Sequence, residues 1–147
     1  MKRLTKLILV FFAAQCAAVA ANAEKTMDIN VLPANAKQVV TQHFGDKAIR
    51  YVEVTRFAIS TPYEVKFEDG TEIEFDSKGE WKEIKARATG IPEALLPQQI
   101  RDYVSGNYKD VKVVEIERKR RGGFDIELNN GLELEFDKNM ALVDIDS

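Results

Sequence analysis

The sequence contains two copies of one hairpin-like pattern, and this internal repeat limits the possible folds more than any other feature. Residues 63–76 (YEVKFEDGTEIEFD) align without a gap with residues 124–137 (FDIELNNGLELEFD). Aromatic residues match aromatic ones, aliphatic residues match aliphatic ones, and the turn glycines fall in register. Self-similarity of this kind marks a duplicated structural unit. We therefore expect two repeats, at about 30–88 and 90–147.

Each repeat is expected to begin with an amphipathic helix. Apolar residues at three-to-four spacing predict the first helix over Ala34–Phe44, and Gly45 suits its C-terminal cap. The second helix is predicted to start at 92 or 93 and to end at 103 or 104. Pro97 either belongs to the first turn of this helix or splits it in two, because a proline in a helix interior removes a hydrogen bond.

Four antiparallel strands are expected to follow each helix. The dipeptides Asp69-Gly70 and Asn130-Gly131 are typical of tight hairpin turns, and such short connections produce a meandering antiparallel sheet. The strands are predicted over 49–59, 63–68, 71–76 and 81–86 in the first repeat, and over 111–120, 124–129, 132–137 and 141–146 in the second.

Alternation along these strands indicates which side of the sheet is buried. Apolar residues occupy every second position and charged residues lie between them, as in a sheet with one solvated face. The two helices are then expected to cover the apolar side, which gives an α+β fold. The residues expected on the covered side are Tyr63, Val65, Phe67, Ile73 and Phe75 in the first repeat, and Phe124, Ile126, Leu128, Leu132, Leu134 and Phe136 in the second.

The N-terminal segment has the order of a secretory signal peptide. A basic stretch over residues 1–6 is followed by the apolar run Leu7–Ala14 and by small residues that end in an A-x-A pattern at Ala23. We therefore expect residues 1–23 to be removed, which leaves a single exported domain over 24–147. No later segment approaches the roughly 18 apolar residues that a membrane-spanning helix needs. The expected location is the periplasm or the outside of the cell.

Charge and cysteine content narrow the possible partners. Cys16 is the only cysteine, and Gln15 stands where a lipoprotein motif has a small residue, so we expect cleavage rather than lipidation. Loss of the leader removes that thiol and three basic residues, which changes the formal charge from -3 to about -6. Nucleic acid is a poor partner for such an acidic chain.

The sequence offers little support for catalysis or for a bound metal. His43 is the only histidine, and its helical neighbours are typical of a core-edge residue. With no second histidine and no cysteine in the mature chain, a structural zinc site is excluded. The chain has no G-x-S-x-G elbow, and the segment 137–144 lacks the ligand spacing of an EF-hand loop. We expect no catalytic residue, no cofactor and no metal site.

The charged side of the sheet is the candidate binding surface. Acidic residues are expected to lie opposite one another across its strands, which costs stability unless cations lie nearby. Lys112, Lys119 and the basic run 118–121 at the Gly122-Gly123 turn are the expected neutralising groups. The candidate partner-binding charged residues are Glu72, Glu74, Arg120, Arg121, Asp125, Glu127, Glu133 and Glu135.

This surface has two interpretations. In the first, the charges balance one another and protect the sheet from edge-to-edge aggregation. In the second, the acidic face and its basic loop dock a protein or peptide of complementary charge. Tyr51, Phe57 and Trp81 are then the candidate aromatic anchors, since aromatic residues often dominate interface energy. Trp81 fits a position in the core equally well.

Taken together, these residues resemble the PepSY-like family of small exported bacterial proteins, whose fold is similar to that of beta-lactamase inhibitor protein. The features shared are a Leu-Pro or Ile-Pro start, a helix that ends in an aromatic residue, and a strand pair around an Asp-Gly or Asn-Gly turn, duplicated after a signal peptide. The resemblance implies a curved sheet of about eight strands with the helices on its convex face. It also implies binding or inhibition rather than catalysis. The chain lacks the cysteines of that inhibitor, so its target is not carried over.

The sequence therefore predicts a non-catalytic, exported protein-binding module. In its specific form, this module inhibits or modulates an envelope or secreted enzyme such as a protease, through the exposed sheet face and loops. The alternative is a sensor of the cell envelope that binds a small ligand or a cation.

Overall fold

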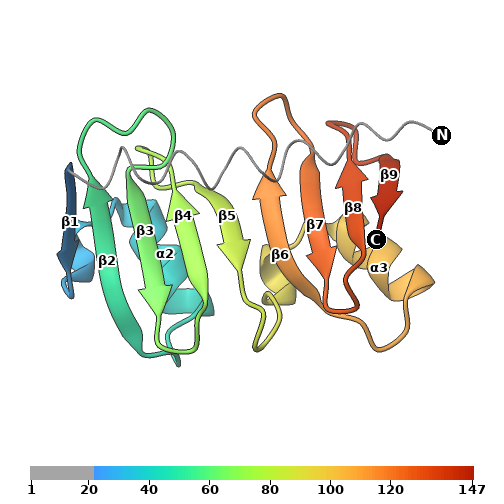
Figure 1. Cartoon of the computed structure of the whole chain (residues 1–147), viewed down its shortest axis with the longest axis horizontal. Helices are drawn as coiled ribbons and strands as arrows, with labels where there is room; N and C mark the ends of the chain where they lie inside the picture. Colours follow the sequence, from blue (N-terminus) through green and yellow to red (C-terminus); the bar gives the residue numbers. More distant parts are fainter. Residues whose placement is uncertain (1–21) are drawn as a thin grey trace.

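The computed structural model describes residues 22–147, which form one antiparallel sheet with helices on one of its faces (Figure 1). Within this range the sheet has nine strands, arranged in their order along the chain from β1 to β9. The fold is α+β, as expected. The expected signal peptide over residues 1–23 lies outside the described residues except for its last two positions. Among the helices of the described range, none is long and apolar enough to cross a bilayer.

The strands follow the predicted pattern closely. Thr71 and Leu132 lie just before the strands expected to begin there, and most other bounds shift by one or two residues. The strands are β1 (Ala23–Thr26), β2 (Ile49–Thr55), β3 (Tyr63–Phe67), β4 (Glu72–Phe75), β5 (Trp81–Lys85), β6 (Val113–Arg118), β7 (Phe124–Leu128), β8 (Glu133–Phe136) and β9 (Leu142–Asp146).

Two differences concern the beginning of the sheet. The prediction extended the first strand to Ile59, but β2 ends at Thr55 because the chain turns away at Phe57, whose backbone has a φ of 66°. The sheet has one strand more than the eight predicted, and this additional strand is β1. It is short and pairs with β2, with Ala23 opposite Thr55. Its four residues carry no clear apolar alternation, and the expected cleavage after Ala23 falls between its first and second residues.

The helices begin after prolines. The 3-10 turn η3 (Ile29–Val31) precedes α2 (Ala34–His43), and the 3-10 turn η4 (Glu93–Leu95) precedes α3 (Gln98–Asn107). The structure resolves the two alternatives for Pro97, which separates η4 from α3 and stands at the N-cap. A proline is tolerated there because the first N–H groups of a helix have no intrahelical partner. The second helix therefore starts later than predicted and continues to Asn107.

The core lies between the helices and the apolar side of the sheet. Val40 of α2 and Ile100 of α3 are buried against strand residues, and Phe44 packs against Phe67 with a ring-centroid distance of 5.6 Å. The residues predicted to share this side do so, and the fully buried ones include Val65, Phe67, Ile73, Phe75, Leu128, Leu134 and Phe136. The pair Ile84 and Ile116 continues the core across β5 and β6, so the sheet is unbroken between its two halves.

Trp81 belongs to this core. Its side chain is 5% exposed and lies 6.2 Å from Phe124, measured between ring centroids. The guanidinium of Arg118 stacks on the indole at 3.9 Å. Of the two alternatives for Trp81, an exposed anchor or a core residue, the structure therefore gives the core, because the irregular pairing at the start of β5 places Trp81 opposite the buried Phe75.

Candidate functional site: the acidic face of the sheet

The side of the sheet opposite the helices carries an unbroken row of carboxylates. From β2 to β9, each of eight consecutive strands contributes one acidic residue, and each lies directly opposite the next across the strand pair. We call this row the acidic ladder. It consists of Glu53, Glu64, Glu74, Glu83, Glu117, Asp125, Glu135 and Asp144.

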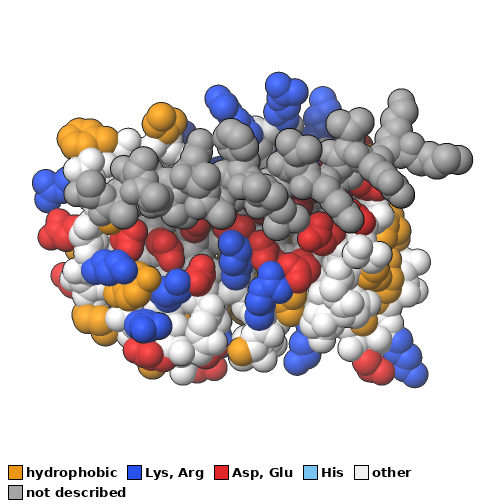
Figure 2. All heavy atoms as spheres, viewed as in Figure 1, with side chains coloured by type: hydrophobic (Ala, Val, Ile, Leu, Met, Phe, Trp, Pro, Cys, Tyr) orange, Lys and Arg blue, Asp and Glu red, His pale blue; other side chains and the backbone are white. Residues whose placement is uncertain are grey.

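A second row runs parallel to the ladder, two residues away on each strand, later or earlier in the sequence according to the direction of the strand. It is mixed in charge over β3 to β5, with Lys66, Glu72 and Lys85, and wholly acidic from β6 onward. The acidic members from β6 to β9 are Glu115, Glu127, Glu133 and Asp146. Figure 2 looks onto this face, where red side chains form a band across the strands with blue side chains among them.

This arrangement follows from the alternation in the sequence. Strands such as β4 (EIEF) and β7 (FDIEL) place acids at every second position, so all acids of a strand share one face. Adjacent strands lie about 4.8 Å apart, and directly opposed side chains interact at that distance. The antiparallel registers then align the acids of successive hairpins into rows.

Five cations contact these carboxylates. Lys25 lies 3.5 Å from Glu53, and Lys66 lies 2.6 Å from Glu72, both measured between nitrogen and oxygen. Lys119 pairs with Asp125 at 3.1 Å and also with Glu135. The other two of the five cations are Lys85 and Arg87. The two rows contain thirteen acids, so the surface keeps a large excess of negative charge.

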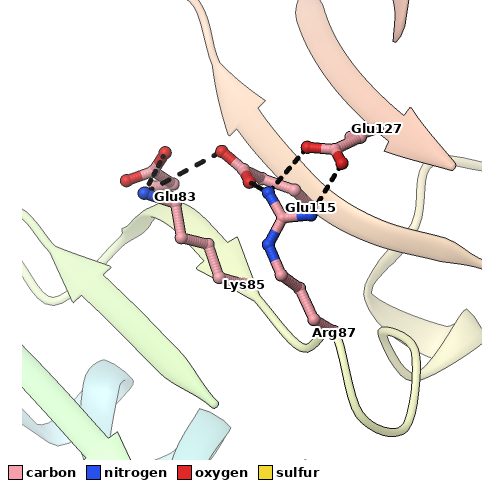
Figure 3. Close-up of polar contacts among 5 residues, drawn as sticks. All are labelled: Glu83, Lys85, Arg87, Glu115 and Glu127. Carbon is pink, nitrogen blue, oxygen red and sulfur yellow. Dashed lines mark hydrogen bonds and ion pairs between the residues drawn. The ribbon is translucent and has the colours of Figure 1, made fainter. Parts of the chain in front are cut away.

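Lys85 and Arg87 link the two halves of the sheet (Figure 3). Lys85 on β5 lies 3.2 Å from Glu83 and 3.9 Å from Glu115 on β6. Arg87 donates from both terminal nitrogens to Glu127, at 2.6 and 2.7 Å, and from Nη2 to Glu115 at 2.9 Å. This bidentate geometry is the strongest that a guanidinium makes with a carboxylate.

Burial and neighbouring charges alter the acidity of carboxyl groups in both rows. Burial, followed by the carboxylates of Glu83 and Glu64, raises the pKa of Glu74 to about 7. Burial likewise raises the pKa of Glu115 to about 7. In contrast, the hydrogen bonds from Arg87 lower the pKa of Glu127. The face therefore contains acids that are protonated far more easily than ordinary surface carboxylates.

A shallow hollow of about 490 Å³ lies on this face over β5 to β9. Five of the predicted residues line it. They are Arg120, Asp125, Glu127, Glu133 and Glu135. Glu72 and Glu74 lie on the same face but outside the hollow, and the ring of Tyr51 lies 4.2 Å from Lys25 Nζ at the β1 end. Phe57 and Arg121 are exposed on loops rather than on the face.

Several residues of this surface were missed by the sequence analysis. Glu83, Glu115 and Glu117 belong to strands that were predicted, and their alternation with Ile84 and Ile116 was a sufficient signal for their outward direction. Arg87 lies beyond the end of β5, where no strand periodicity indicates its direction. Lys119 neutralises the face as expected, whereas Lys112 lines a different hollow.

That second hollow, of about 460 Å³, lies on the helical side and includes His43 and Lys112 in its lining. Its histidine has no cysteine or second histidine beside it among the lining residues. Across the whole of residues 22–147, no three His, Cys, Asp or Glu side chains are grouped so that they would hold a metal ion.

Comparisons with known proteins identify a matching family model and similar solved structures of periplasmic proteins. A family model described as "Putative beta-lactamase-inhibitor-like, PepSY-like" matches residues 61–144. A crystal structure from Bacteroides thetaiotaomicron, described as a "putative calcium-regulated periplasmic protein", is 35% identical and superposes with a TM-score of 0.81. The match covers 87% of this chain and 99% of that one.

Two crystal structures from Bacteroides vulgatus, both described as periplasmic proteins, are also similar. One is 32% identical with a TM-score of 0.79, over 87% of this chain and 99% of that chain. The other, of unknown function, is 36% identical with a TM-score of 0.76, over 85% of this chain and 99% of that chain. No curated protein matches the sequence significantly.

Proposed function

The chain belongs to the PepSY-like family, and from that premise we propose that it is a non-catalytic binding module whose acidic sheet face captures a cationic segment of a protein or peptide. The protein is exported, in keeping with its periplasmic relatives. The observation that carries the proposal is the acidic ladder, with eight carboxylates directly opposed on eight consecutive strands.

The ladder is costly for the folded protein alone. Like charges directly opposite each other on neighbouring strands are destabilising. Half of the eight ladder acids make no ion pair among residues 22–147, namely Glu64, Glu74, Glu117 and Asp144. A partner with several Lys or Arg side chains relieves this repulsion when it binds. Charge complementarity also accelerates encounter and disfavours acidic competitors.

Arg87 indicates how a partner's arginine would be held. It binds Glu127 through two nearly parallel hydrogen bonds and reaches Glu115 on the neighbouring strand. Glu115 and Glu127 belong to the second row, and carboxylate pairs of the ladder, such as Glu64 and Glu74, have the same cross-strand relation without a guanidinium between them. We infer that an arginine or lysine from a partner occupies such pairs.

In its finer form, the proposal includes inhibition or modulation of an envelope or secreted enzyme such as a protease. The description of the matching family as beta-lactamase-inhibitor-like supports a role of this kind. We further infer that residues 1–23 are a cleaved signal peptide and that 24–147 form one domain built from two duplicated repeats, since residues 63–76 and 124–137 align without a gap.

The test is binding of a labelled decalysine peptide to residues 22–147, which contain the whole sheet and core. At pH 8, where Glu74 is ionised, the variant E64Q/E74Q/E117Q removes three ladder charges and should weaken binding by about tenfold or more, because charge pairs at an interface act directly on affinity. Binding should also weaken steeply as salt is added.

The matched control is E68Q/E93Q/D102N, which removes three exposed acids that lie outside the two rows. This control should change the affinity by less than about twofold, since only the net charge is altered. Equal weakening by both triple variants would mean that overall charge, and not the ladder, attracts the peptide, and the proposal would fail.

Calcium binding is the second candidate. The relative from Bacteroides thetaiotaomicron is described as calcium-regulated, and Ca²⁺ prefers several carboxylate oxygens. Because no three acids of residues 22–147 are grouped as a metal site, binding would require rearrangement of the ladder side chains. Calorimetric titration with CaCl₂ and with decalysine separates the two candidates. Heat from calcium alone would favour the cation sensor.

A further inference from the structure

One end of the strands carries the β2–β3 and β6–β7 loops, and it differs in character from the acidic face. We call this end of the sheet the loop edge. In Figure 1 the β2–β3 and β6–β7 loops project from the same end of the strands, at the top of the view. The first of these loops is apolar at its tip and the second is basic. Figure 2 shows orange side chains above β2 and β3 and blue side chains around the β6–β7 loop.

The apolar tip is fully presented to solvent. Phe57 is 93% exposed, and Ile59 is fully exposed. Two large apolar side chains at the end of one loop gain nothing for the fold, since neither packs against the core. Phe57 also has a positive φ of 66°, a backbone conformation that is unfavourable for a residue with a side chain.

The base of this loop is held in place. Thr55 N donates to Pro62 O at 2.8 Å, which closes the loop across its two ends. Arg56 pairs with Glu24 of β1 at 3.3 Å. The exposed tip therefore extends from a fixed base, and its apolar residues do not arise from a loose chain end.

The β6–β7 loop contributes positive charge at the same edge. Arg120 and Arg121 are exposed, and among residues 22–147 neither makes an ion pair. Lys138, in the β8–β9 turn, lies beside Gly122 and is also exposed. Lys119 turns to the sheet face, where it neutralises Asp125 and Glu135, and Arg120 borders the hollow on that face without an ion pair among residues 22–147.

We propose that this loop edge, formed by Phe57, Ile59, Arg120, Arg121 and Lys138, docks the protein on an anionic phospholipid membrane. Phe57 and Ile59 enter the headgroup region while the arginines and the lysine contact lipid phosphates. Exposed apolar residues on the same end of the molecule as unpaired cations are the combination that binds a protein to the surface of an anionic bilayer without spanning it.

Charge complementarity selects lipid phosphate as the partner of this edge. The acidic ladder repels an anionic surface. However, the ladder acids beside the β6–β7 loop, Asp125 and Glu135, are neutralised by Lys119. The repulsion from the other ladder acids is screened by salt beyond about 8 Å at physiological ionic strength. Docking by this end of the strands leaves the acidic face upright, roughly perpendicular to the bilayer, and free for a separate partner.

The test is sedimentation of residues 22–147 with two kinds of vesicle. One is phosphatidylcholine with about one third phosphatidylglycerol, an anionic lipid content that attracts clusters of basic residues, and the other is pure phosphatidylcholine. The protein should sediment with the anionic vesicles only. Each of the variants F57S/I59S and R120Q/R121Q should reduce the bound fraction by about fivefold or more, since stable attachment needs both signals.

Matched controls remove the same chemistry elsewhere. M27S/V31S removes two exposed apolar residues, and K109Q/K112Q removes two exposed cations, all outside the loop edge. Both controls should bind as the parent chain does. In addition, the emission of F57W should shift to the blue with anionic vesicles, against a constant background from the buried Trp81.

Failure to sediment with anionic vesicles would overturn the proposal, as would equal losses in the control variants. Binding that depends on the arginines but not on Phe57 and Ile59 would also overturn it, because the apolar tip would then have no role. If an oligoglutamate peptide binds the edge and vesicles do not, the edge serves a protein partner instead.

Discussion

Glu74 on β4 lies directly opposite Glu83 on β5, so two carboxylates face each other at the centre of the acidic ladder. Glu83 is paired with Lys85 at 3.2 Å, whereas Glu74 makes no ion pair among residues 22–147. Burial, followed by Glu83 and Glu64, raises the pKa of Glu74 to about 7. This residue therefore changes its charge in the neutral range of pH.

The protein should lose stability as the pH rises from about 5 to about 8. In the folded chain the pKa of Glu74 and of Glu115 is about 7, above the ordinary glutamate value of 4.5, so the folded chain binds more protons than the unfolded chain between these values. The resulting stabilisation is complete below the unfolded pKa and disappears as the pH rises through 7. Urea unfolding should give a free energy lower at pH 8 than at pH 5 by about 1–3 kcal/mol.

Substitution of Glu74 identifies its share of this effect. E74Q keeps the shape of the side chain and removes its charge, so it should raise the free energy of unfolding at pH 8 and have little effect at pH 5. E68Q is the matched control, since Glu68 is exposed and lies outside the two rows. A pH dependence that remains unchanged in E74Q would show that other groups are responsible.

Arg87 should stabilise the junction between the two halves of the sheet. R87Q leaves Glu115 and Glu127 close together without their shared cation. Because Arg87 is 61% exposed, the loss is limited by solvent screening to about 1 kcal/mol at neutral pH. The double variant R87Q/E127Q should recover part of the loss, and chemical denaturation of the four proteins measures the coupling directly. Additive effects would contradict a direct interaction.

The sequence was sufficient to predict the layers of the fold. Residues such as Val65 and Ile126 alternate with charged neighbours, and this period decides which side of a strand is buried. The tight turns at Gly70 and Gly131 then set the antiparallel order. Both signals are local, and they agree with each other along the chain.

The acidic ladder was only partly predictable, because it depends on register between strands. The sequence shows that Asp125 and Glu135 face outward, but their alignment with Glu117 and Glu83 across β5 to β8 is a long-range relation. The position of Arg87 depends on the path of the chain after β5. The exposed position of Phe57 was compatible with the predicted role, whereas Trp81 was ambiguous because Trp occurs both in cores and at interfaces.

Trp81 provides a direct check of the core. Its indole packs against Phe124 and beneath Arg118, so W81A should lower the free energy of unfolding by about 3–5 kcal/mol. Trp81 is the only tryptophan in the sequence. The emission of the native protein should therefore be blue-shifted, resistant to iodide, and unchanged by decalysine. Strong quenching by iodide would place the indole at the surface instead.

Gly123 is where the β6–β7 turn approaches β8 most closely, and it should tolerate no side chain. A Cβ at this position would lie 2.2 Å from the carbonyl oxygen of Phe136, and the residue has a φ of 95°. G123A therefore combines backbone strain with a collision against backbone atoms that cannot move independently. We predict a loss of at least about 2 kcal/mol in the free energy of unfolding, measured with urea.

Gly131 separates the two causes, because it has a similar φ of 88° but no atom within 4 Å of an added Cβ. G131A should cost only the conformational penalty, about 1 kcal/mol. The difference between the two variants then measures the close approach of the β6–β7 turn to Phe136. That contact fixes the base of the loop that carries Arg120 and Arg121, so G123A should also reduce binding to anionic vesicles. Equal destabilisation by G123A and G131A would mean that the turn can move away from β8 without cost.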